Sequence, residues 1–213
     1  IIEEVMIARV RALLLIKHQY DALKQQAEDM RWIAVTDSLT GVRSKRFLVD
    51  NGEAYISNPD YQPVWGMLID IDYFKNINDT LGHITGDHVL AELGEKLNSA
   101  FADGMVVRFG GEEFSILVPN LNADQMLERA EQLRNDIATL NPAGVNITVS
   151  IGLASTGDHP DETLTRFLSM ADKALYSAKE AGRNRIYIYT LQGTIPSPWN
   201  EEPDFSEPVP TFT

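Results

Sequence analysis

The stretch VWGMLIDIDYFKNINDTLGHITGD, at residues 64–87, is the most informative part of the chain. It contains an apolar run that ends in carboxylates. Residues 64–70 predict a buried strand, and Asp70 and Asp72 stand at its carboxyl end. Carboxylates are costly to bury at such a place unless they hold a metal ion or a cationic partner. The residues that follow can turn backbone N–H groups toward a phosphate, and Lys75 adds a positive charge. Alone, this stretch fits a metal site and a solvated acidic turn that caps a helix about equally well.

Outward from this stretch, residues 36–190 alternate strand-like and helix-like patterns. The strand at 64–70 is followed by a polar turn, and the apolar runs on either side of Gly110 and Gly111 predict a β-hairpin. Three more runs have helical period (86–101, 123–140 and 164–182), and two have strand character (145–154 and 185–189). Hairpins mixed with helical crossovers predict an α+β domain, in which helices cover the faces of a central sheet.

The predicted hairpin carries the sequence RFGGEEF at residues 108–114. Its two glycines give a tight turn without side chains above it, so a nucleotide could lie against bare backbone. Glu112 and Glu113 follow, and alternation along a strand would send their side chains to opposite faces. One of them could then join Asp70 around a metal ion. Alone, the motif also fits an ordinary hairpin with a polar edge.

A basic element, DKALYSAKEAGRNR at residues 172–185, lies near the end of the domain. Lys179 and Arg183 are four residues apart, so they share a helix face or sit just past the end of the helix. Together they could clamp the outer oxygens of a triphosphate. Gly182 is typical of a helix stop. A basic helix end that complements the helix dipole would explain the same residues locally.

Four motifs together resemble the GGDEF family of diguanylate cyclases in their order and separation. They are DSLTGVRSKR (37–46), DIDYFKNINDTLGHITGD (70–87), RFGGEEF and ADKALYSAKEAGRNR (171–185). The resemblance covers essentially all of residues 36–190. It implies a polymerase-palm-like sheet related to that of the nucleotidyl cyclases. It also implies the condensation of two GTP molecules into cyclic di-GMP, with release of pyrophosphate.

The resemblance implies a metal site and catalytic carboxylates. Asp70 and Glu112 would hold two Mg²⁺ ions per active site, or Mn²⁺ in their place, and the carbonyl of Ile71 would help. Glu113 occupies a further acidic position that the family needs. Glu112 is placed to assist deprotonation of the attacking ribose 3′-hydroxyl, whose pKa one metal ion would lower.

The resemblance also implies which residues bind GTP. These are Phe74 (through its backbone), Lys75, Lys179 and Arg183 for the phosphates, Gly110 and Gly111 at the bare turn, and Asn78 and Asp87 for the guanine. A carboxylate at Asp87 can accept the N1–H and N2–H donors of guanine but would face an acceptor on adenine. Such a site rejects the wrong base strongly, because its polar groups are left unpaired.

Each domain of this family binds one GTP, so two domains must face each other as half-sites, which implies a homodimer. Residues 1–35 contain no proline or glycine and predict one long helix. Its seam has heptad spacing, with Met6, Leu13, Tyr20, Ala27 and Ala34 seven apart and Arg9, Ile16, Leu23 and Met30 between them. A coiled-coil dimer would raise the effective concentration of the second domain. An amphipathic helix packed on its own domain is the alternative.

The run ARVRALLLIK, at residues 8–17, resembles the last helix of a response-regulator receiver domain. Because the chain starts at Ile1, it looks like a fragment, and a phosphorylatable input domain is expected upstream. We expect such a domain to control activity by setting the geometry of the dimer.

Composition limits which binding partners and which cellular location we expect for the protein. The formal net charge of −13 should repel nucleic acid, whereas metal ions can neutralise the phosphates of a nucleotide. The absence of cysteine excludes disulfides and thiolate metal sites, and the four histidines lack zinc-ligand spacing. No run is apolar enough to span a membrane and no signal peptide is recognisable, so we expect a cytoplasmic protein. Residues 191–213, acidic and proline-rich, are expected to form a disordered tail.

The chain departs from the family at one motif. Many members carry an Arg-x-x-Asp product-inhibition motif shortly before the Gly-Gly turn, and the corresponding stretch here is Phe101-Ala102-Asp103-Gly104. We therefore expect no tight product feedback through that site. The alternative function is a catalytically inactive GGDEF domain that senses GTP or cyclic di-GMP, but such domains usually lose the acidic residues kept here. A purely structural dimerisation module would leave the polar motifs unexplained.

Overall fold

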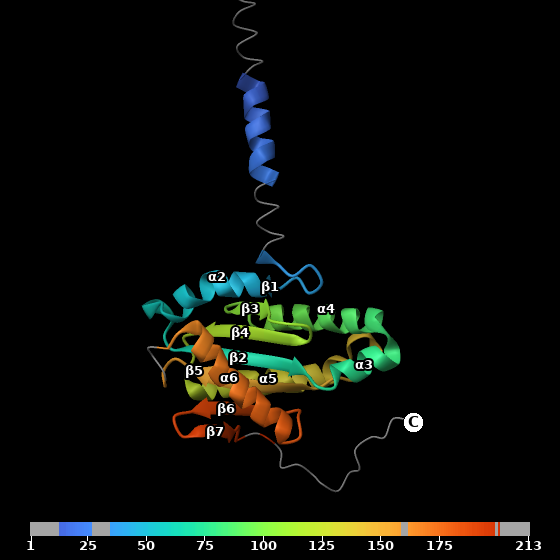
Figure 1. Cartoon of the computed structure of the whole chain (residues 1–213), viewed down its shortest axis with the longest axis vertical. Helices are drawn as coiled ribbons and strands as arrows, with labels where there is room; N and C mark the ends of the chain where they lie inside the picture. The colour runs from blue at the N-terminus through green and yellow to red at the C-terminus, as the bar shows by residue number, and fades with distance from the viewer. Residues whose placement is uncertain (1–12, 27–34, 159–161, 199, 201–213) are drawn as a thin grey trace, which may run out of the picture.

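The computed structural model describes residues 13–26, 35–158, 162–198 and 200 (Figure 1). Its strands are β1 (Arg43–Ser44), β2 (Val64–Ile71), β3 (Met105–Arg108), β4 (Glu113–Pro119), β5 (Val149–Ser155), β6 (Ile186–Thr190) and β7 (Gly193–Pro196). Its helices include α2 (Lys45–Ile56), α3 (Phe74–Leu81), α4 (His83–Ala100), α5 (Ala123–Leu140) and α6 (Leu164–Glu180), with short 3-10 turns at Pro59–Tyr61 and Pro142–Gly144. The predicted α+β class, with helices on the faces of a central sheet, is confirmed.

Strand β2 lies at the centre of a seven-stranded sheet of order β1-β3-β4-β2-β5-β6-β7. It runs antiparallel to both β4 and β5. In this register Asp70 stands opposite Glu113 of β4 and Ser150 of β5. Residues directly opposite across antiparallel strands project to the same face. The sheet therefore places Asp70 and Glu113 on one face, at the carboxyl end of β2.

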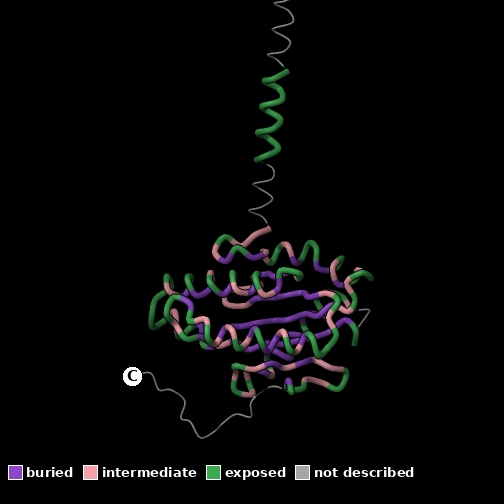
Figure 2. Tube along the Cα trace, turned by 180° about the vertical axis from the view of Figure 1, so that it is seen from behind, coloured by how far each residue is buried: buried purple, intermediate pink, exposed green. Residues whose placement is uncertain are grey.

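The two faces of β2 are buried in different clusters, because side chains alternate along a strand. Met67 and Ile69 belong to a core cluster that includes residues of α4 and α5, and Leu68 belongs to one that includes residues of α2 and α6. Figure 2 shows the buried strands between helices whose outer sides are exposed. Helix α6 approaches β5 closely at Gly152, where an added Cβ would lie 2.1 Å from the carbonyl oxygen of Ala171.

The segment after β2 differs from the expected polar turn, because Phe74–Leu81 forms helix α3. Tyr73 enters this helix with a φ of 57°, and no side chain caps its start. Helix starts are recognised in a sequence by a Ser, Thr, Asp or Asn cap. That signal is missing here, so the sequence pattern did not reveal the helix.

The helix over residues 13–26 extends away from the sheet (Figure 1), and all of its residues are exposed. Within it, the seam residues Leu13, Ile16, Tyr20 and Leu23 are 61–66% exposed. This exposure argues against packing on its own domain. Residues 1–12 and 27–34 of the predicted helix lie outside the described residues. No helix within the described ranges is both long and apolar enough to cross a membrane.

The predicted boundary of a disordered tail at residue 191 lies too early. Residues Gly193–Pro196 form β7, which pairs antiparallel with β6. Beyond β7, the side chain of Asn200 accepts the backbone N–H of Ile186 at 3.0 Å and donates to its carbonyl at 2.8 Å. Composition averaged over the whole segment hid a short run that can pair with a sheet edge. Residues 199 and 201–213 lie outside the described residues.

Candidate active site

Asp70 is a buried carboxylate at the carboxyl end of β2, and it is only 8% exposed. Its Oδ2 lies 2.7 Å from Nζ of Lys179, in the last turn of α6. Burial is the largest cause that raises the pKa of Asp70, Lys179 acts against it, and the charges of Glu112 and Glu113 raise it further. The net result is a raised pKa. An ionised Asp70 is thus costly here, and a site of this kind favours an added cation.

The two hairpin glutamates relate differently to Asp70. Glu113 is the first residue of β4 and stands directly opposite Asp70. Glu112 precedes the strand and lies in the turn, so strand alternation does not decide where its side chain points. The sequence pattern allowed one glutamate to join Asp70 while the other faces away. In the structure both charges act on Asp70.

The Gly-Gly turn is closed by backbone hydrogen bonds of 3.2 Å in both directions between Gly110 and Glu113. Neither glycine has a positive φ, so the turn does not require their conformational freedom. A Cβ at Gly111 would meet no atom within 4 Å, whereas one at Gly110 would lie 2.8 Å from Oε2 of Glu113. Gly111 therefore leaves the surface of the turn bare, and Gly110 makes room for the Glu113 side chain.

Arg108 holds this turn in place, although the sequence analysis did not single it out. Its Nε and Nη2 donate to the carbonyl oxygen of Gly111 at 3.1 and 2.8 Å, and its Nη1 donates to Oδ1 of Asp37 at 3.1 Å. Asp37 also accepts the backbone N–H and the hydroxyl of Thr40. Arg108 thus connects the hairpin to the start of the domain. Its partner lies 71 residues away, so no local sequence signal could reveal the contact.

The predicted guanine residues are brought together where α3 packs on α4. A Cβ added at Gly86 would lie 2.0 Å from Oδ1 of Asn78, so the Asn78 side chain rests on the bare backbone of α4. Asp87 follows Gly86 and is exposed. At the start of α3, Phe74 is buried and Lys75 is exposed. Gly86 was not identified from the sequence, yet its missing side chain lets Asn78 approach α4 one residue before Asp87.

Arg183 lies beyond the end of α6 and not on its face, with a φ of 65°. Its N–H donates to the carbonyl of Ala178 at 3.0 Å. Its guanidinium carbon stands 4.6 Å from the ring centroid of Tyr73, and its Nη1 donates to the Tyr73 hydroxyl at 3.5 Å. Because Tyr73 directly precedes α3, Arg183 is held close to the start of that helix.

Asp72 has a different environment from Asp70, although both follow the same apolar run. It is buried and accepts the hydroxyls of Thr148 and Ser150, each at 2.7 Å. It also accepts the backbone N–H of Asn184 at 3.0 Å. Three hydrogen bonds satisfy this carboxylate within the protein, so its burial needs no metal ion.

The site suits a magnesium ion by its chemistry. Within the described part of the chain, no three His, Cys, Asp or Glu side chains form a ready-made metal cluster. The donors near Asp70 are nevertheless carboxylate oxygens, which Mg²⁺ prefers, and their charges raise the pKa of Asp70. Ile71 follows Asp70 and ends β2, so its backbone carbonyl is one residue from that carboxylate.

Comparison with known proteins places these features in a family. The family model described as the diguanylate cyclase GGDEF domain matches residues 34–185. Response regulator PleD of Caulobacter vibrioides (strain NA1000 / CB15N) is 36% identical over 192 residues, which are 84% of this chain and 41% of PleD. Diguanylate cyclase DosC of Escherichia coli (strain K12) is 36% identical over 165 residues, which are 72% of this chain and 35% of DosC. The chain thus spans less than half the length of these relatives.

Solved structures show the same architecture. The coiled coil and GGDEF domain of DgcB from Caulobacter crescentus, in complex with c-di-GMP, matches with a TM-score of 0.75 at 28% identity, over 84% of this chain and 96% of that chain. The active GGEEF domain of a diguanylate cyclase from Vibrio cholerae matches with a TM-score of 0.56 at 38% identity, over 60% of this chain and 83% of that chain. The predicted palm-like fold is confirmed. This chain belongs to the GGDEF family of diguanylate cyclases.

Proposed function

We propose that this domain condenses two GTP molecules into cyclic di-GMP and releases pyrophosphate. The arrangement around Asp70 supports this most strongly. A buried carboxylate with a raised pKa pairs with a lysine and is influenced by the charges of two glutamates, at the carboxyl end of the central strand β2. Raised pKa values of this origin are typical of functional sites. Membership in the family supports GTP as the substrate and phosphodiester formation as the reaction.

Asp70 and Glu112 would hold two Mg²⁺ ions, or Mn²⁺, with help from the carbonyl of Ile71. When bound, the metal would lower the pKa of the attacking 3′-hydroxyl and offset negative charge on the α-phosphate and the leaving group. Glu112 would assist in taking the proton from that hydroxyl. Glu113, opposite Asp70 on β4, would keep a second carboxylate on the same face of the sheet.

The phosphates would lie between the end of α6 and the start of α3. Lys179 would approach from the last turn of α6, and Arg183 from just beyond it, where Arg183 already stands beside Tyr73. The backbone at Phe74 offers unpaired N–H groups at the helix start, and Lys75 adds a charge. The guanine would reach Asn78 and Asp87, and the bare turn at Gly110 and Gly111 would leave room for the nucleotide.

A dimer would bring two such half-sites face to face. The exposed seam of Leu13, Ile16, Tyr20 and Leu23 is an apolar surface with heptad spacing that a second copy would cover. DgcB, whose structure includes a coiled coil, and PleD, a response regulator, support a dimer-forming helix and an upstream receiver domain. We expect the enzyme to act in the cytoplasm, and an upstream domain to control it through dimer geometry.

The test is to incubate the purified chain with GTP and Mg²⁺ at high protein concentration and to separate the products by chromatography. A Glu112→Ala chain is the control. Cyclic di-GMP from the wild type and none from Glu112→Ala would support the proposal. Bound GTP without product, even after two chains are forced into a dimer, would instead indicate an inactive domain that senses the nucleotide.

A further inference from the structure

The turn after α6 has an unusual backbone. Gly182, Arg183 and Asn184 have φ values of 116°, 65° and 46°. Left-handed conformations are unfavourable for residues with a Cβ, so two in succession persist only where neighbouring groups hold them. The carbonyl of Arg183 accepts a hydrogen bond from Nε of Arg185 at 2.9 Å, which constrains one peptide of this turn.

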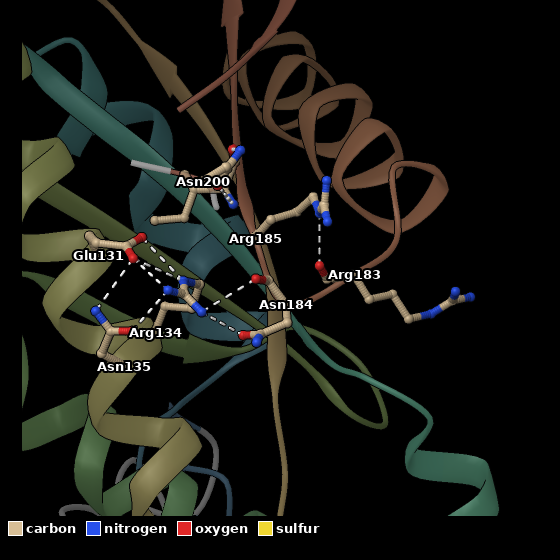
Figure 3. A network of polar contacts seen from close by, with 8 residues as sticks. Glu131, Arg134, Asn135, Arg183, Asn184, Arg185 and Asn200 are labelled. Atoms are coloured by element: carbon tan, nitrogen blue, oxygen red, sulfur yellow. Dashed lines mark hydrogen bonds and ion pairs between the residues drawn. The ribbon is translucent and has the colours of Figure 1, made fainter. Parts of the chain in front are cut away.

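Arg134 of α5 constrains the next residue from the other side (Figure 3). Its Nη1 donates to the side-chain oxygen of Asn184 at 2.7 Å and to its carbonyl oxygen at 3.3 Å. One guanidinium nitrogen thus holds both the backbone and the side chain of a left-handed residue. The side chain of Arg134 is only 11% exposed, whereas Asn184 is exposed.

The guanidinium of Arg134 is itself fixed. Its Nε donates to both carboxylate oxygens of Glu131, at 3.1 and 3.2 Å, and its Nη2 donates to Glu131 and to Asn135. Glu131 is buried. A buried bidentate pair of this kind has a defined geometry, so it can serve as a rigid support for Asn184.

In Figure 3 the side chain of Arg183 points away from Arg134, on the other side of the turn. That side leads to Tyr73 at the start of α3. Arg134 therefore contacts the turn on one side, while the side chain of Arg183 projects from the other side. The five N–H donors of Arg134 face protein acceptors, so Arg134 is not placed to bind substrate.

We propose that Arg134 is a positioning residue for the phosphate site: by holding Asn184 in its left-handed conformation, it aims the guanidinium of Arg183 at the start of α3. This inference rests on the proposed function, because that function assigns Arg183 to the GTP phosphates. It adds a residue on a distant helix whose loss should weaken GTP binding without touching the substrate.

The experiment compares Arg134→Ala with Arg129→Ala. Arg129 is a matched control because it lies on the same helix and also bridges to another element, where it donates to Asp103 and to the carbonyl of Ala100. We expect Arg134→Ala to raise the KM for GTP about tenfold with kcat little changed, the size expected from weakening a charge-assisted hydrogen bond. Arg129→Ala should leave KM near the wild-type value. Equal KM values in the two variants would overturn the inference.

Two further readouts separate positioning from a general loss of structure. Combined with Arg183→Ala, the Arg134→Ala substitution should raise KM little further, because both act through one guanidinium. Adding Asn184→Gly to Arg134→Ala should bring the raised KM part of the way back to the wild-type value, since glycine adopts a positive φ unaided. Strictly additive effects, or no recovery, would contradict the role.

The last measurement, limited proteolysis, does not depend on catalysis. Trypsin cleaves after arginine, so the loosened turn at Arg183 and Arg185 should be cut faster in Arg134→Ala than in Arg129→Ala, at matched global stability. Equal cleavage rates would refute the positioning role. If Arg134→Ala is cleaved faster but the wild type binds no GTP and forms no product, then Arg134 does support the turn and the proposed function is refuted.

Discussion

The ammonium group of Lys179 lies 2.7 Å from Oδ2 of Asp70, a buried carboxylate. The pair offsets part of the cost of burying Asp70, since an unpaired buried charge is strongly unfavourable. The same lysine is a candidate ligand for the GTP phosphates. When metal and nucleotide bind, Lys179 can exchange Asp70 for the phosphates, while the metal ions take over as the positive partners of Asp70.

Removing this lysine should make the protein depend on a metal ion for stability. Lys179→Ala leaves Asp70 without its partner, and we expect it to lower the free energy of unfolding by about 1–2 kcal/mol, less than for a fully buried pair. Millimolar Mg²⁺ should then raise the Tm of Lys179→Ala more than that of the wild type. Lys173→Ala, on the same helix, is the control. Equal Mg²⁺ shifts in all three chains would argue against a metal at Asp70.

Gly86 should be required for GTP binding and not for helix formation. Alanine at a helical glycine normally adds about 0.5–1 kcal/mol of stability. Here its Cβ would lie 2.0 Å from Oδ1 of Asn78, so the asparagine must move. We expect Gly86→Ala to raise the KM for GTP and to weaken the preference for GTP over ATP. A variant that is more stable than the wild type, with unchanged KM, would show that Asn78 tolerates the change.

The pH dependence of stability should report on Asp37. Burial raises the pKa of Asp37, but hydrogen bonds from Thr40 and Arg108 outweigh it, so the net pKa is below the ordinary value of 3.8. A carboxylate with a depressed pKa stabilises the fold above its unfolded pKa, and this contribution is lost as the pH falls through the folded pKa. Asp37→Asn should therefore cost about 1–2 kcal/mol at pH 7 and progressively less below about pH 4.

Urea unfolding from pH 7 down to the lowest pH at which the wild type stays folded measures this difference. Asp50→Asn is a suitable control, because its pair with Arg46 is largely exposed, at 58% and 77% of the two side chains. The control should change stability by less than about 0.5 kcal/mol at any pH. A cost of Asp37→Asn that does not vary with pH would contradict the assigned ion pair.

Product feedback should be weak. The stretch that replaces the inhibition motif is engaged within the protein, because Arg129 donates to Asp103 and its guanidinium stacks 4.3 Å from the ring centroid of Phe101. Phe101 has an apolar side chain and is fully buried, so it offers a ligand neither a polar group nor an accessible surface. Initial rates measured with added cyclic di-GMP should fall only where the product competes with GTP. Inhibition at sub-micromolar product that GTP does not relieve would contradict this.

The fold was predictable where the chain carries strong local signals. The run at 64–69 is apolar throughout and forms most of β2, and Gly110 and Gly111 mark a hairpin that the structure confirms. Helix α3 was missed because Tyr73, the residue that precedes it, provides no capping side chain. Strand β7 was missed because an acidic, proline-rich composition describes the average of residues 191–213 and not the four residues that pair with β6.

The site was predictable as a set of residue types but not as a geometry. Asp70 and Lys179 were each singled out, yet only the fold shows that they form a pair, because they lie far apart in sequence. Asp72 carries the same local signal as Asp70 but is satisfied by hydroxyls of β5 and its neighbour Thr148. Arg134 resembles any basic residue on an amphipathic helix, and its role depends on a turn 50 residues away.

The central claim is that Asp70 anchors a metal-dependent site for GTP, and Asp70→Asn tests it most directly. Asparagine keeps the shape of the side chain and removes its charge, so circular dichroism and urea unfolding should still show a folded domain. The measurement is cyclic di-GMP formation from GTP and Mg²⁺, with wild type and Asp70→Asn at equal protein concentration. We predict product from the wild type and none from Asp70→Asn. Comparable product from the folded Asp70→Asn chain would contradict the claim.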